Sequence, residues 1–319
     1  MRVILIIPLR DDWLCAGELI RRIDTATYNS PHTFSIILVD DGSVSKRDSR
    51  EFSGPFSAVR AIRILRLRRN LGHQRAIAIG LAYTHHADTS DAVAVMDADG
   101  EDTPEGLALL LETFSQSGGS KAIFAKRSKR SESILFRLFY HVYRGVHWTL
   151  TGVSVRVGNF SILPSEYLDA MVAMSELWNH YAAAVFRSRL PHSMIPIARG
   201  NRISGKSTMN FVALVSHGLS AISVFGDVVG VRLMIASLAA SLLAGAGILV
   251  VIAIRFFTDL AVPGWATYAA GMLIVIMIQL IATATSFTFF TLSNRTDLGF
   301  IPLRDYSLFV EGVQDVYPE

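Results

Sequence analysis

Four carboxylates lie within one stretch of six residues: Asp97, Asp99, Glu101 and Asp102. A solvated turn tolerates such a cluster, because exposed like charges are well screened. A divalent-cation site requires one, because Mg²⁺ and Mn²⁺ take carboxylate oxygens and keep open positions for phosphate. The stretch therefore predicts either a solvated turn or a metal site that serves a phosphate group.

The elements that must position these carboxylates can be predicted from the pattern of apolar residues. Short runs rich in β-branched residues predict strands at residues 2–9, 34–40, 61–67, 92–97 and 121–126. Apolar residues at helical spacing predict helices over residues 13–28, 73–86 and 104–115. Strands and helices in alternation predict an α/β fold, with a mostly parallel sheet and helices on both faces.

A second acidic motif, "VDDGS" at residues 39–43, also follows a predicted strand. In open parallel sheets, ligands bind beyond the carboxyl ends of the strands. Two acidic strand ends on one rim favour a site for a metal ion and a nucleotide over a bare solvated turn.

The apolar residues of the chain are concentrated in its last third. The hydrophobic fraction is 51%, the charged fraction is 18% and the mean hydropathy is +0.38, which points toward a membrane. Residues 233–254 and 260–294 are uncharged and long enough to cross a bilayer as helices. The break at residues 255–264 is short enough for a hairpin turn.

Basic residues lie before the first span and after the second, namely Arg199, Arg202, Lys206, Arg232, Arg295 and Arg304, whereas the turn between the spans has only Arg255 at its edge. The positive-inside rule then predicts an integral membrane protein with its α/β domain and both termini in the cytoplasm. Cys15 is the only cysteine, which excludes an intrachain disulfide. The net charge of +3 gives no reason to expect nucleic acid as a partner.

These segments predict four parts of the chain. Residues 1–206 form the α/β domain, 207–231 a juxtamembrane amphipathic helix, 232–292 a two-helix transmembrane hairpin and 293–319 a cytoplasmic tail. Residues 134–150 predict a further helix, with basic residues among aromatic ones. It is either a cationic amphipathic helix on a membrane surface or an ordinary core helix with a polar face.

Six motifs, in their order along the chain, carry a resemblance to a known family: "VDDGS" (39–43), "RNLGHQRAIAIGL" (69–81), "MDADGEDTPE" (96–105), "KRSKRSE" (126–132), "GNFSILP" (158–164) and "RISGKSTMN" (202–210). With the two spans, they resemble the family 2 glycosyltransferases of GT-A fold that load a sugar onto a polyprenyl phosphate. Dolichyl-phosphate mannosyltransferases and bactoprenol glucosyltransferases are members. The resemblance runs from about residue 2 to residue 292. It implies a metal-dependent, inverting transferase that uses a nucleoside-diphosphate sugar and an undecaprenyl or dolichyl type of phosphate at the cytoplasmic membrane face.

The resemblance implies a donor site on the acidic rim. The nucleotide-sugar contacts that it implies are Pro8, Asp40, Asp41, Asn70, Gly72, Asp97 and Asp99. The implied cofactor is Mg²⁺ or Mn²⁺, held by Asp97, Asp99 and Glu101. Many relatives have Gln where Glu101 stands, and a carboxylate there is expected to tighten divalent binding. The residues "PLRDDW" at 8–13 depart from the family's Pro-x-Tyr-Asn-Glu pattern, which leaves the nucleotide base open.

On the acceptor side, the resemblance implies cations that grip a phosphate. The acceptor-phosphate contacts that it implies are Arg127, Arg130, Arg202, Ser204 and Lys206. Arginine grips phosphate bidentately, and a general attraction of these cations to anionic lipid is the alternative. Asp99, Arg127 and Arg202 are the expected catalytic residues.

No side-chain nucleophile is needed, because an acceptor phosphate is ionised near neutral pH and can attack the anomeric carbon directly. Some relatives carry an Asp that has been proposed as a base, and Asn159 stands in its place here. If a base were essential, Glu176 or Asp169 would have to take that role. Asn159 indicates that positioning and charge carry the chemistry. Asp102, with Thr103 and Pro104, is expected to start and cap the next helix. The histidines, His73 among them, are expected to be surface or packing residues.

Two other functions remain open: transfer to another membrane lipid, such as a ceramide or diacylglycerol, and a non-catalytic scaffold that binds nucleotide sugar. A lipid alcohol would need a general base, and the Gln-x-x-Arg-Trp signature of ceramide-type relatives is absent from the sequence. Asn159, Glu101 and the departure at residues 8–13 favour the scaffold. Small residues on one span, Ala239, Ala240, Ala244, Gly245 and Gly247, predict a homo-oligomer.

Overall fold

The structure is a computed structural model that describes residues 1–87, 89–127, 134–153, 157–204, 211–259, 262, 264–296 and 299–318. The chain divides into two compact units. The first unit comprises Met1–Tyr140, Val153–Val224 and Gly299–Glu319, and the second comprises His141–Gly152 and Phe225–Leu298.

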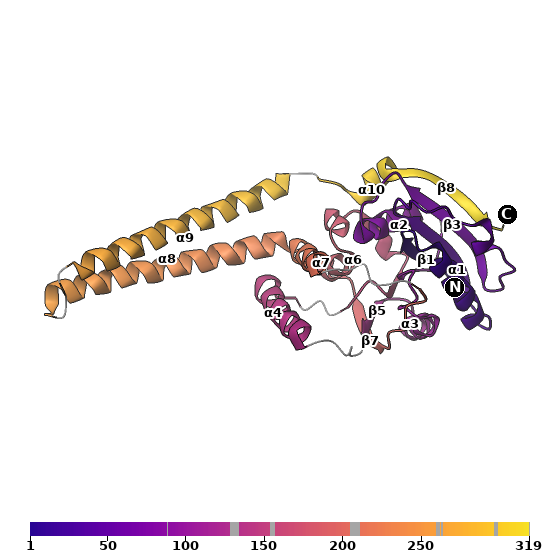
Figure 1. Cartoon of the computed structure of the whole chain (residues 1–319), viewed down its shortest axis with the longest axis horizontal. Helices are drawn as coiled ribbons and strands as arrows, with labels where there is room; N and C mark the ends of the chain where they lie inside the picture. Colours follow the sequence, from indigo (N-terminus) through magenta and orange to yellow (C-terminus); the bar gives the residue numbers. More distant parts are fainter. Residues whose placement is uncertain are drawn as a thin grey trace. The chain divides into compact units, whose positions relative to one another are not determined.

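The first unit is built on one sheet, which Figure 1 shows in ribbon form. In the part of the chain that the structure describes, its strands are β1 (Arg2–Leu9), β2 (Thr33–Asp40), β3 (Val59–Leu67), β4 (Ala92–Val95), β5 (Ala122–Arg127), β6 (Ser161–Pro164), β7 (His192–Ile197) and β8 (Val310–Tyr317). They lie in the order β7-β5-β6-β4-β1-β2-β3-β8. Only β6 and β8 run antiparallel to their neighbours among these strands, so the mostly parallel sheet is confirmed.

Helices cover this sheet and form the second unit. The α-helices of the described residues are α1 (Trp13–Ala26), α2 (His73–Ala87), α3 (Pro104–Gln116), α4 (Ile134–Thr151), α5 (Tyr167–Val172), α6 (Tyr181–Arg187), α7 (Phe211–Ser223), α8 (Gly226–Phe257), α9 (Trp265–Thr296) and α10 (Pro302–Asp305). Short 3₁₀ turns are η1 (Ser49–Phe52), η2 (Ser175–Trp178) and η3 (Tyr306–Phe309). The predicted helices at 13–28, 73–86, 104–115 and 134–150 are all confirmed.

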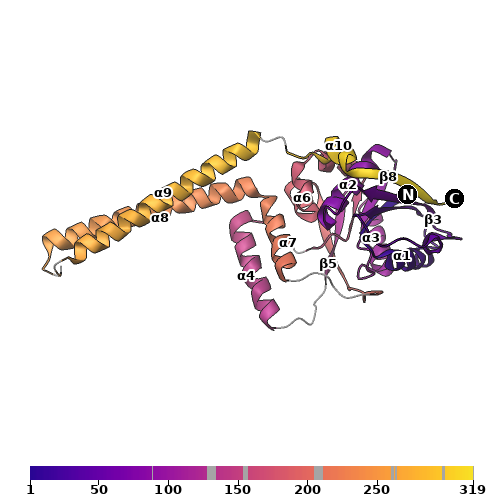
Figure 2. The same cartoon turned by 45° about the horizontal axis from the view of Figure 1, so that its top comes forward.

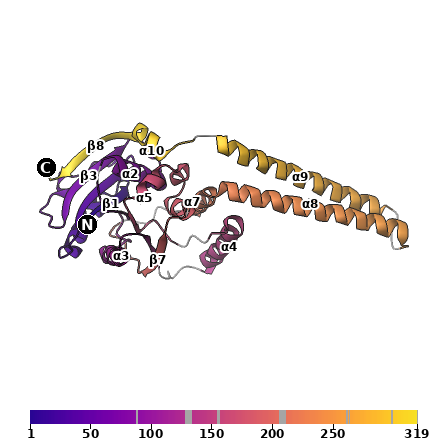
Figure 3. The same ribbon diagram turned by 180° about the vertical axis from the view of Figure 1, so that it is seen from behind.

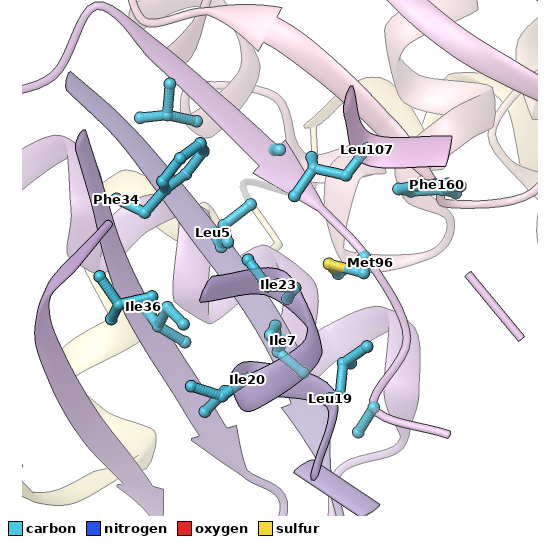
Figure 4. Packing of buried hydrophobic residues seen from close by; sticks show 14 of the residues in the cluster. Leu5, Ile7, Leu19, Ile20, Ile23, Phe34, Ile36, Met96, Leu107 and Phe160 are labelled. Atoms are coloured by element: carbon cyan, nitrogen blue, oxygen red, sulfur yellow. The ribbon is translucent and has the colours of Figure 1, made fainter. Parts of the chain in front are cut away.

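Both faces of the sheet are buried, which explains why β1 is apolar at almost every position. Leu5 and Ile7 point to the face covered by α1 and α3, and Figure 4 shows them packed with side chains of α1. Ile4 and Ile6 point to the opposite face, covered by α2, α5 and α6. Figures 2 and 3 show these helices from two further directions. A parallel sheet between two helix layers requires such continuous apolar strands.

Helix α2 lies unusually close to the sheet at Gly80. A Cβ atom at that position would stand 2.7 Å from Cγ2 of Ile6 and 2.9 Å from Cγ2 of Val39. The absent side chain therefore lets the helix approach β1 and β2 closely. This close packing fixes the start of α2 at the carboxyl ends of those strands.

Strand β8 is an element that the sequence analysis did not predict. It pairs antiparallel with β3, and Arg63 Nε lies 2.9 Å from Asp315 Oδ1 across the pair. Most of its side chains are exposed, so its sequence lacks the apolar run of a buried strand. Residues 310–317, expected to be part of a tail, complete the edge of the sheet instead.

In the second unit, α8 and α9 run side by side, as Figures 1 and 3 show. Both are long and apolar enough to cross a membrane. Large apolar side chains along them are exposed, among them Leu242, Leu243 and Met272. Such a surface calls for apolar surroundings. The predicted spans at 233–254 and 260–294 coincide with most of these two helices.

Candidate active site

The polar residues of the candidate site gather where the parallel strands end. β1, β2 and β4 pair in parallel, so residues 40–41 and 97–102 follow strands at one edge of the sheet. β5 and β7 also pair in parallel, with Arg127 opposite Ile197. The basic loop that follows β7, residues 199–204, therefore begins at the same edge as the acidic turn that follows β4.

Asp41 is held by the main chain. Its carboxylate accepts hydrogen bonds from the amides of Leu71 (2.6 Å) and Gly72 (2.9 Å). Asn70 Oδ1 also accepts a hydrogen bond from the Gly72 amide at 3.0 Å. Burial raises the pKa of Asp41 more than these amides lower it. The predicted nucleotide residues Asp41, Asn70 and Gly72 are thus joined by hydrogen bonds at one place on the rim.

Asp40 is buried beside a cavity of about 340 Å³. Its Oδ1 accepts a hydrogen bond from the Ser43 amide at 2.8 Å, and its Oδ2 lies 3.5 Å from Arg66 Nε. Trp13 and the β8 residue Gln314 also line the cavity. Pro8 lies in β1, paired with Val39, the residue before Asp40.

The acidic turn reverses direction at Gly100, whose φ of +83° is a conformation that side chains disfavour. The Asp99 carboxylate accepts a hydrogen bond from the Glu101 amide at 2.9 Å. Asp99 and Glu101 are each largely buried, with side chains 12% and 11% exposed. The turn therefore presents two carboxylates that little water reaches, and such charges need partners.

Asp102 has a different role from the expected one. Thr103 is the cap of α3, and its hydroxyl accepts a hydrogen bond from the Gly106 amide at 3.1 Å. The Asp102 carboxylate instead accepts a hydrogen bond from the Asp97 amide at 2.9 Å. The helix begins where the sequence predicted, but Asp102 closes the acidic turn rather than capping the helix.

The basic loop docks on the acidic turn through its main chain and its side chains. The amides of Gly200 and Ile203 donate to the carbonyl oxygens of Glu101 and Asp99, each at 2.9 Å. Arg202 donates from its guanidinium to Asp99 Oδ2 at 2.6 Å. Arg199 forms an ion pair with Glu101. Two arginines thus pair with two of the three carboxylates predicted to bind metal.

Arg199 is a site residue that the sequence analysis missed, having treated it only as a basic flank of the first span. Burial lowers the pKa of its guanidinium, as does Arg202, while Asp99 and Asp97 raise it. The available signal was the "RGNR" spacing, which puts Arg199 one short loop before Arg202.

His73 was also missed, since it was expected to be a surface or packing residue. Its Nε2 lies 3.1 Å from Asp97 Oδ1 and 3.0 Å from Asn159 Nδ2. Burial lowers the pKa of His73, but the carboxylates of Asp97, Asp102 and Asp41 together raise it by more, so the net shift is upward. Its position at the first turn of α2, on the rim, was the available signal.

Asn159 is fixed in a chain of hydrogen bonds. The Tyr181 amide donates to Gln74 Oε1 at 2.7 Å, and Gln74 Nε2 donates to Asn159 Oδ1 at 3.1 Å. The substitute bases are engaged with other partners: Glu176 lies 3.0 Å from Arg187, and Asp169 lies 2.5 Å from His85.

The acceptor residues are only partly within the described residues. Arg127 ends β5 at the rim, and Ser204 is exposed, two residues after Arg202. Arg130 and Lys206 lie outside the described residues.

The acidic turn fits a divalent cation by the type of its donors. Asp97, Asp99 and Glu101 offer the oxygen ligands that Mg²⁺ and Mn²⁺ prefer. Among the described residues, however, the structure contains no group of three His, Cys, Asp or Glu side chains gathered as a metal would require. Arg199 and Arg202 form ion pairs with two of the three carboxylates.

A family model described as Glycosyl transferase family 2 matches residues 5–171, which include the acidic turn. The chain is 24% identical over 272 residues to the uncharacterized glycosyltransferase YkcC of Bacillus subtilis, covering 82% of this chain and 80% of that protein. It is 26% identical to an undecaprenyl-phosphate 4-deoxy-4-formamido-L-arabinose transferase of Klebsiella pneumoniae, covering 72% of each.

The fold is similar to that of a solved enzyme. Glucosyl-3-phosphoglycerate synthase of Mycobacterium tuberculosis, in complex with Mn²⁺, UDP-glucose and phosphoglyceric acid, superposes with a TM-score of 0.51 at 14% identity. The similarity covers 72% of this chain and 80% of that one. At this identity it shows the GT-A type of fold.

Proposed function

Because the chain belongs to glycosyl transferase family 2, we propose that it moves a sugar from a nucleoside-diphosphate sugar to a polyprenyl phosphate at the cytoplasmic face of a membrane. The observation that carries the proposal is the basic loop docked on the acidic turn, with Arg202 at 2.6 Å from Asp99. This arrangement puts cations suited to an acceptor phosphate beside carboxylates suited to a donor diphosphate. The undecaprenyl-phosphate transferases among the relatives support the choice of acceptor.

The donor is proposed to lie along the rim between the two acidic strand ends. Asp40 and Asp41, with the turn at Asn70 and Gly72, would position the nucleoside. Asp97, Asp99 and Glu101 would hold the divalent cation, which supplies Lewis-acid stabilisation of the leaving diphosphate when it is bound. The solved synthase with Mn²⁺ and UDP-glucose supports a divalent cation and a nucleotide sugar.

The acceptor is proposed to be bound by cationic side chains, with a serine hydroxyl as an added hydrogen-bond donor. Arg127 and Arg202, with Ser204 and with Arg130 and Lys206 beyond the described residues, would grip its phosphate. A phosphate oxygen that is already ionised would attack the anomeric carbon with inversion, so the chain's own residues need not remove a proton. Asn159 accepts a hydrogen bond from Gln74, and in this proposal it positions the rim and does not act as a base.

Exposed apolar surfaces support a membrane location. Val142 and Trp148 are exposed on α4, and Val212 and Leu219 are exposed on α7. Moreover, β3 and β8 pair in one sheet although α8 and α9 separate them in sequence. If both helices cross a bilayer, the residues before α8 and after α9 must therefore lie on the same side of it.

The test is turnover by the purified full-length chain. Nucleotide sugars are first screened by thermal shift with Mg²⁺ or Mn²⁺, and mass spectrometry then identifies the lipid product. We expect a sugar on undecaprenyl or dolichyl phosphate, loss of product in Asp99→Asn, and normal product in the control Glu112→Gln, an exposed carboxylate on α3. Transfer to a ceramide or diacylglycerol alone would contradict the proposed acceptor. Binding of nucleotide sugar without any transfer would indicate the scaffold.

A further inference from the structure

We propose that Arg199 and Arg202 are internal counter-ions that a divalent cation displaces from Glu101 and Asp99, and that the displaced guanidinium groups then bind a phosphate monoester. The phosphate site would thus form fully only after the cation is bound. The identity of the phosphate as the acceptor's headgroup rests on the proposed function, but the exchange itself does not.

The first step of the argument is competition for the same oxygens. Arg202 reaches Asp99 Oδ2 at 2.6 Å, and Arg199 contacts Glu101. A divalent cation binds carboxylate oxygen at about 2.0–2.1 Å. The cation and the guanidinium groups would repel each other strongly in a largely buried site. They therefore cannot both occupy the inner positions beside these carboxylates.

The second step concerns where the arginines would go. The loop that carries them is tied to the turn by the amides of Gly200 and Ile203, which donate to main-chain carbonyls at 2.9 Å. These main-chain bonds do not involve the carboxylates, so the exchange need not break them. The displaced guanidinium groups would stay within a side chain's length of the rim.

The third step is that both arginines are equipped to take an anion. Their side chains are 21% and 27% exposed, so they are close to solvent while remaining partly desolvated. The buried Nε of Arg199 has no hydrogen-bond partner among the described residues, so its N–H group remains available to donate to an anion. A guanidinium fork that has lost its carboxylate finds a second suitable partner in phosphate.

Glu101 matters to this arrangement because it is the partner of the second ion pair: Arg202 pairs with Asp99, and Arg199 pairs with Glu101. A Gln in its place would remove the carboxylate with which Arg199 forms its ion pair, and only the ion pair between Asp99 and Arg202 would remain. With Glu101 present, the cation has to release two guanidinium groups. Because such coupling is reciprocal, the phosphate must then tighten binding of the cation by the same factor.

The exchange can be tested by equilibrium binding without any nucleotide sugar. Farnesyl phosphate is titrated by calorimetry into the full-length chain in detergent, with EDTA or with saturating Mn²⁺. We expect Mn²⁺ to tighten its binding by about tenfold, and farnesyl phosphate to tighten Mn²⁺ binding equally. Equal affinity for farnesyl phosphate in EDTA and in Mn²⁺ would overturn the proposal, as would an absence of Mn²⁺ binding.

A double variant, Asp99→Asn with Glu101→Gln, separates exchange from direct bridging by the metal. It removes both carboxylate charges while keeping the shape of the side chains. The exchange predicts that farnesyl phosphate binds in EDTA as tightly as the unmodified chain binds it in Mn²⁺. If the metal itself holds the phosphate, the double variant will not bind farnesyl phosphate under either condition, and the proposal fails. Its melting temperature, compared with that of the unmodified chain, verifies that it folds.

Two further arms complete the experiment. Arg22→Ala removes an exposed arginine that pairs with Glu18 at 2.8 Å on α1, and it should behave as the unmodified chain. Inorganic phosphate replaces farnesyl phosphate in the second arm. Coupling to both ligands supports the exchange at a general phosphate site even if no lipid transfer is ever observed. Coupling to farnesyl phosphate alone supports both the exchange and a lipid acceptor.

Discussion

The two acidic strand ends of this molecule look alike in sequence, but Asp41 after β2 and the carboxylates after β4 have different principal partners. After β2, Asp41 accepts hydrogen bonds from the main-chain amides of Leu71 and Gly72. After β4, Asp99 and Glu101 meet the side-chain cations of Arg202 and Arg199. All three carboxylates lie at the same edge of the same sheet.

The difference lies in whether the partner can leave. A main-chain amide is fixed by the fold, so the carboxylate that it binds serves as part of the structural framework of the site. A guanidinium group on a flexible side chain can exchange for another cation. We therefore expect a carboxylate held by main-chain amides to shape the site, and a carboxylate held by side-chain cations to take part in the proposed chemistry.

The sharpest test of this comparison is Asp99→Asn. We expect turnover to fall by about 100-fold or more, because the developing charge on the diphosphate loses its stabilisation. The melting temperature should change little, since the amide keeps the shape of the turn. An assay of lipid product, together with a thermal melt, measures both. A large loss of thermal stability at normal turnover would mean that Asp99 has a structural role and not a chemical one.

Asp41→Ala should have the opposite profile. The amides of Leu71 and Gly72 would lose a buried acceptor, so the free energy of unfolding should fall by about 1–3 kcal/mol. The thermal melt should move clearly downward, and nucleotide affinity should fall with it. Asp41→Asn, which keeps one acceptor oxygen, should be milder. If Asp41→Ala melts normally, the main-chain contacts are not structural.

Thr103→Ala tests the link between the acidic turn and α3. Loss of the hydroxyl that accepts from the Gly106 amide should cost about 1 kcal/mol of stability. Thr113 lies on the same helix, and its hydroxyl bonds to the Leu109 carbonyl at an exposed position. Thr113→Ala should change stability by no more than about 0.5 kcal/mol. Similar thermal melts for the two variants would exclude a capping role for Thr103.

Asn159→Asp should have the smallest effect. The new carboxylate would still accept from Gln74 and would face His73, so the rim should keep its shape. Turnover of the purified variant should stay near that of the unmodified chain. A large gain in rate would show that the reaction is limited by a missing base.

Much of the fold could be predicted because its central strands are buried on both faces. The run at residues 2–9 is apolar for that reason, and its strand was predicted correctly. β6 has only four residues, and β8 is an exposed edge strand, so neither has a distinctive pattern. These strands depend on partners that are distant in sequence, and no local signal records such partners.

The residues of the candidate site also divide into those that the sequence could predict and those that it could not. Asp99 and Glu101 could be predicted because their spacing is local and the chemistry of the residues is plain. Arg199 and His73 could not, because their importance comes from contacts across the rim with Glu101 and Asp97. A lone arginine in a basic loop, or a histidine at a helix start, has many ordinary explanations.

Strand β8 has a consequence for how this chain is made. The ribosome must complete both hydrophobic helices before the residues that pair with β3 emerge. Until then, the nascent protein carries β3 as an open edge of unpaired amides and carbonyls, the kind of edge that invites aggregation. Synthesis of the hydrophobic hairpin and closure of the sheet are therefore successive events in biogenesis, and a chain cut short after α9 would leave that edge permanently bare.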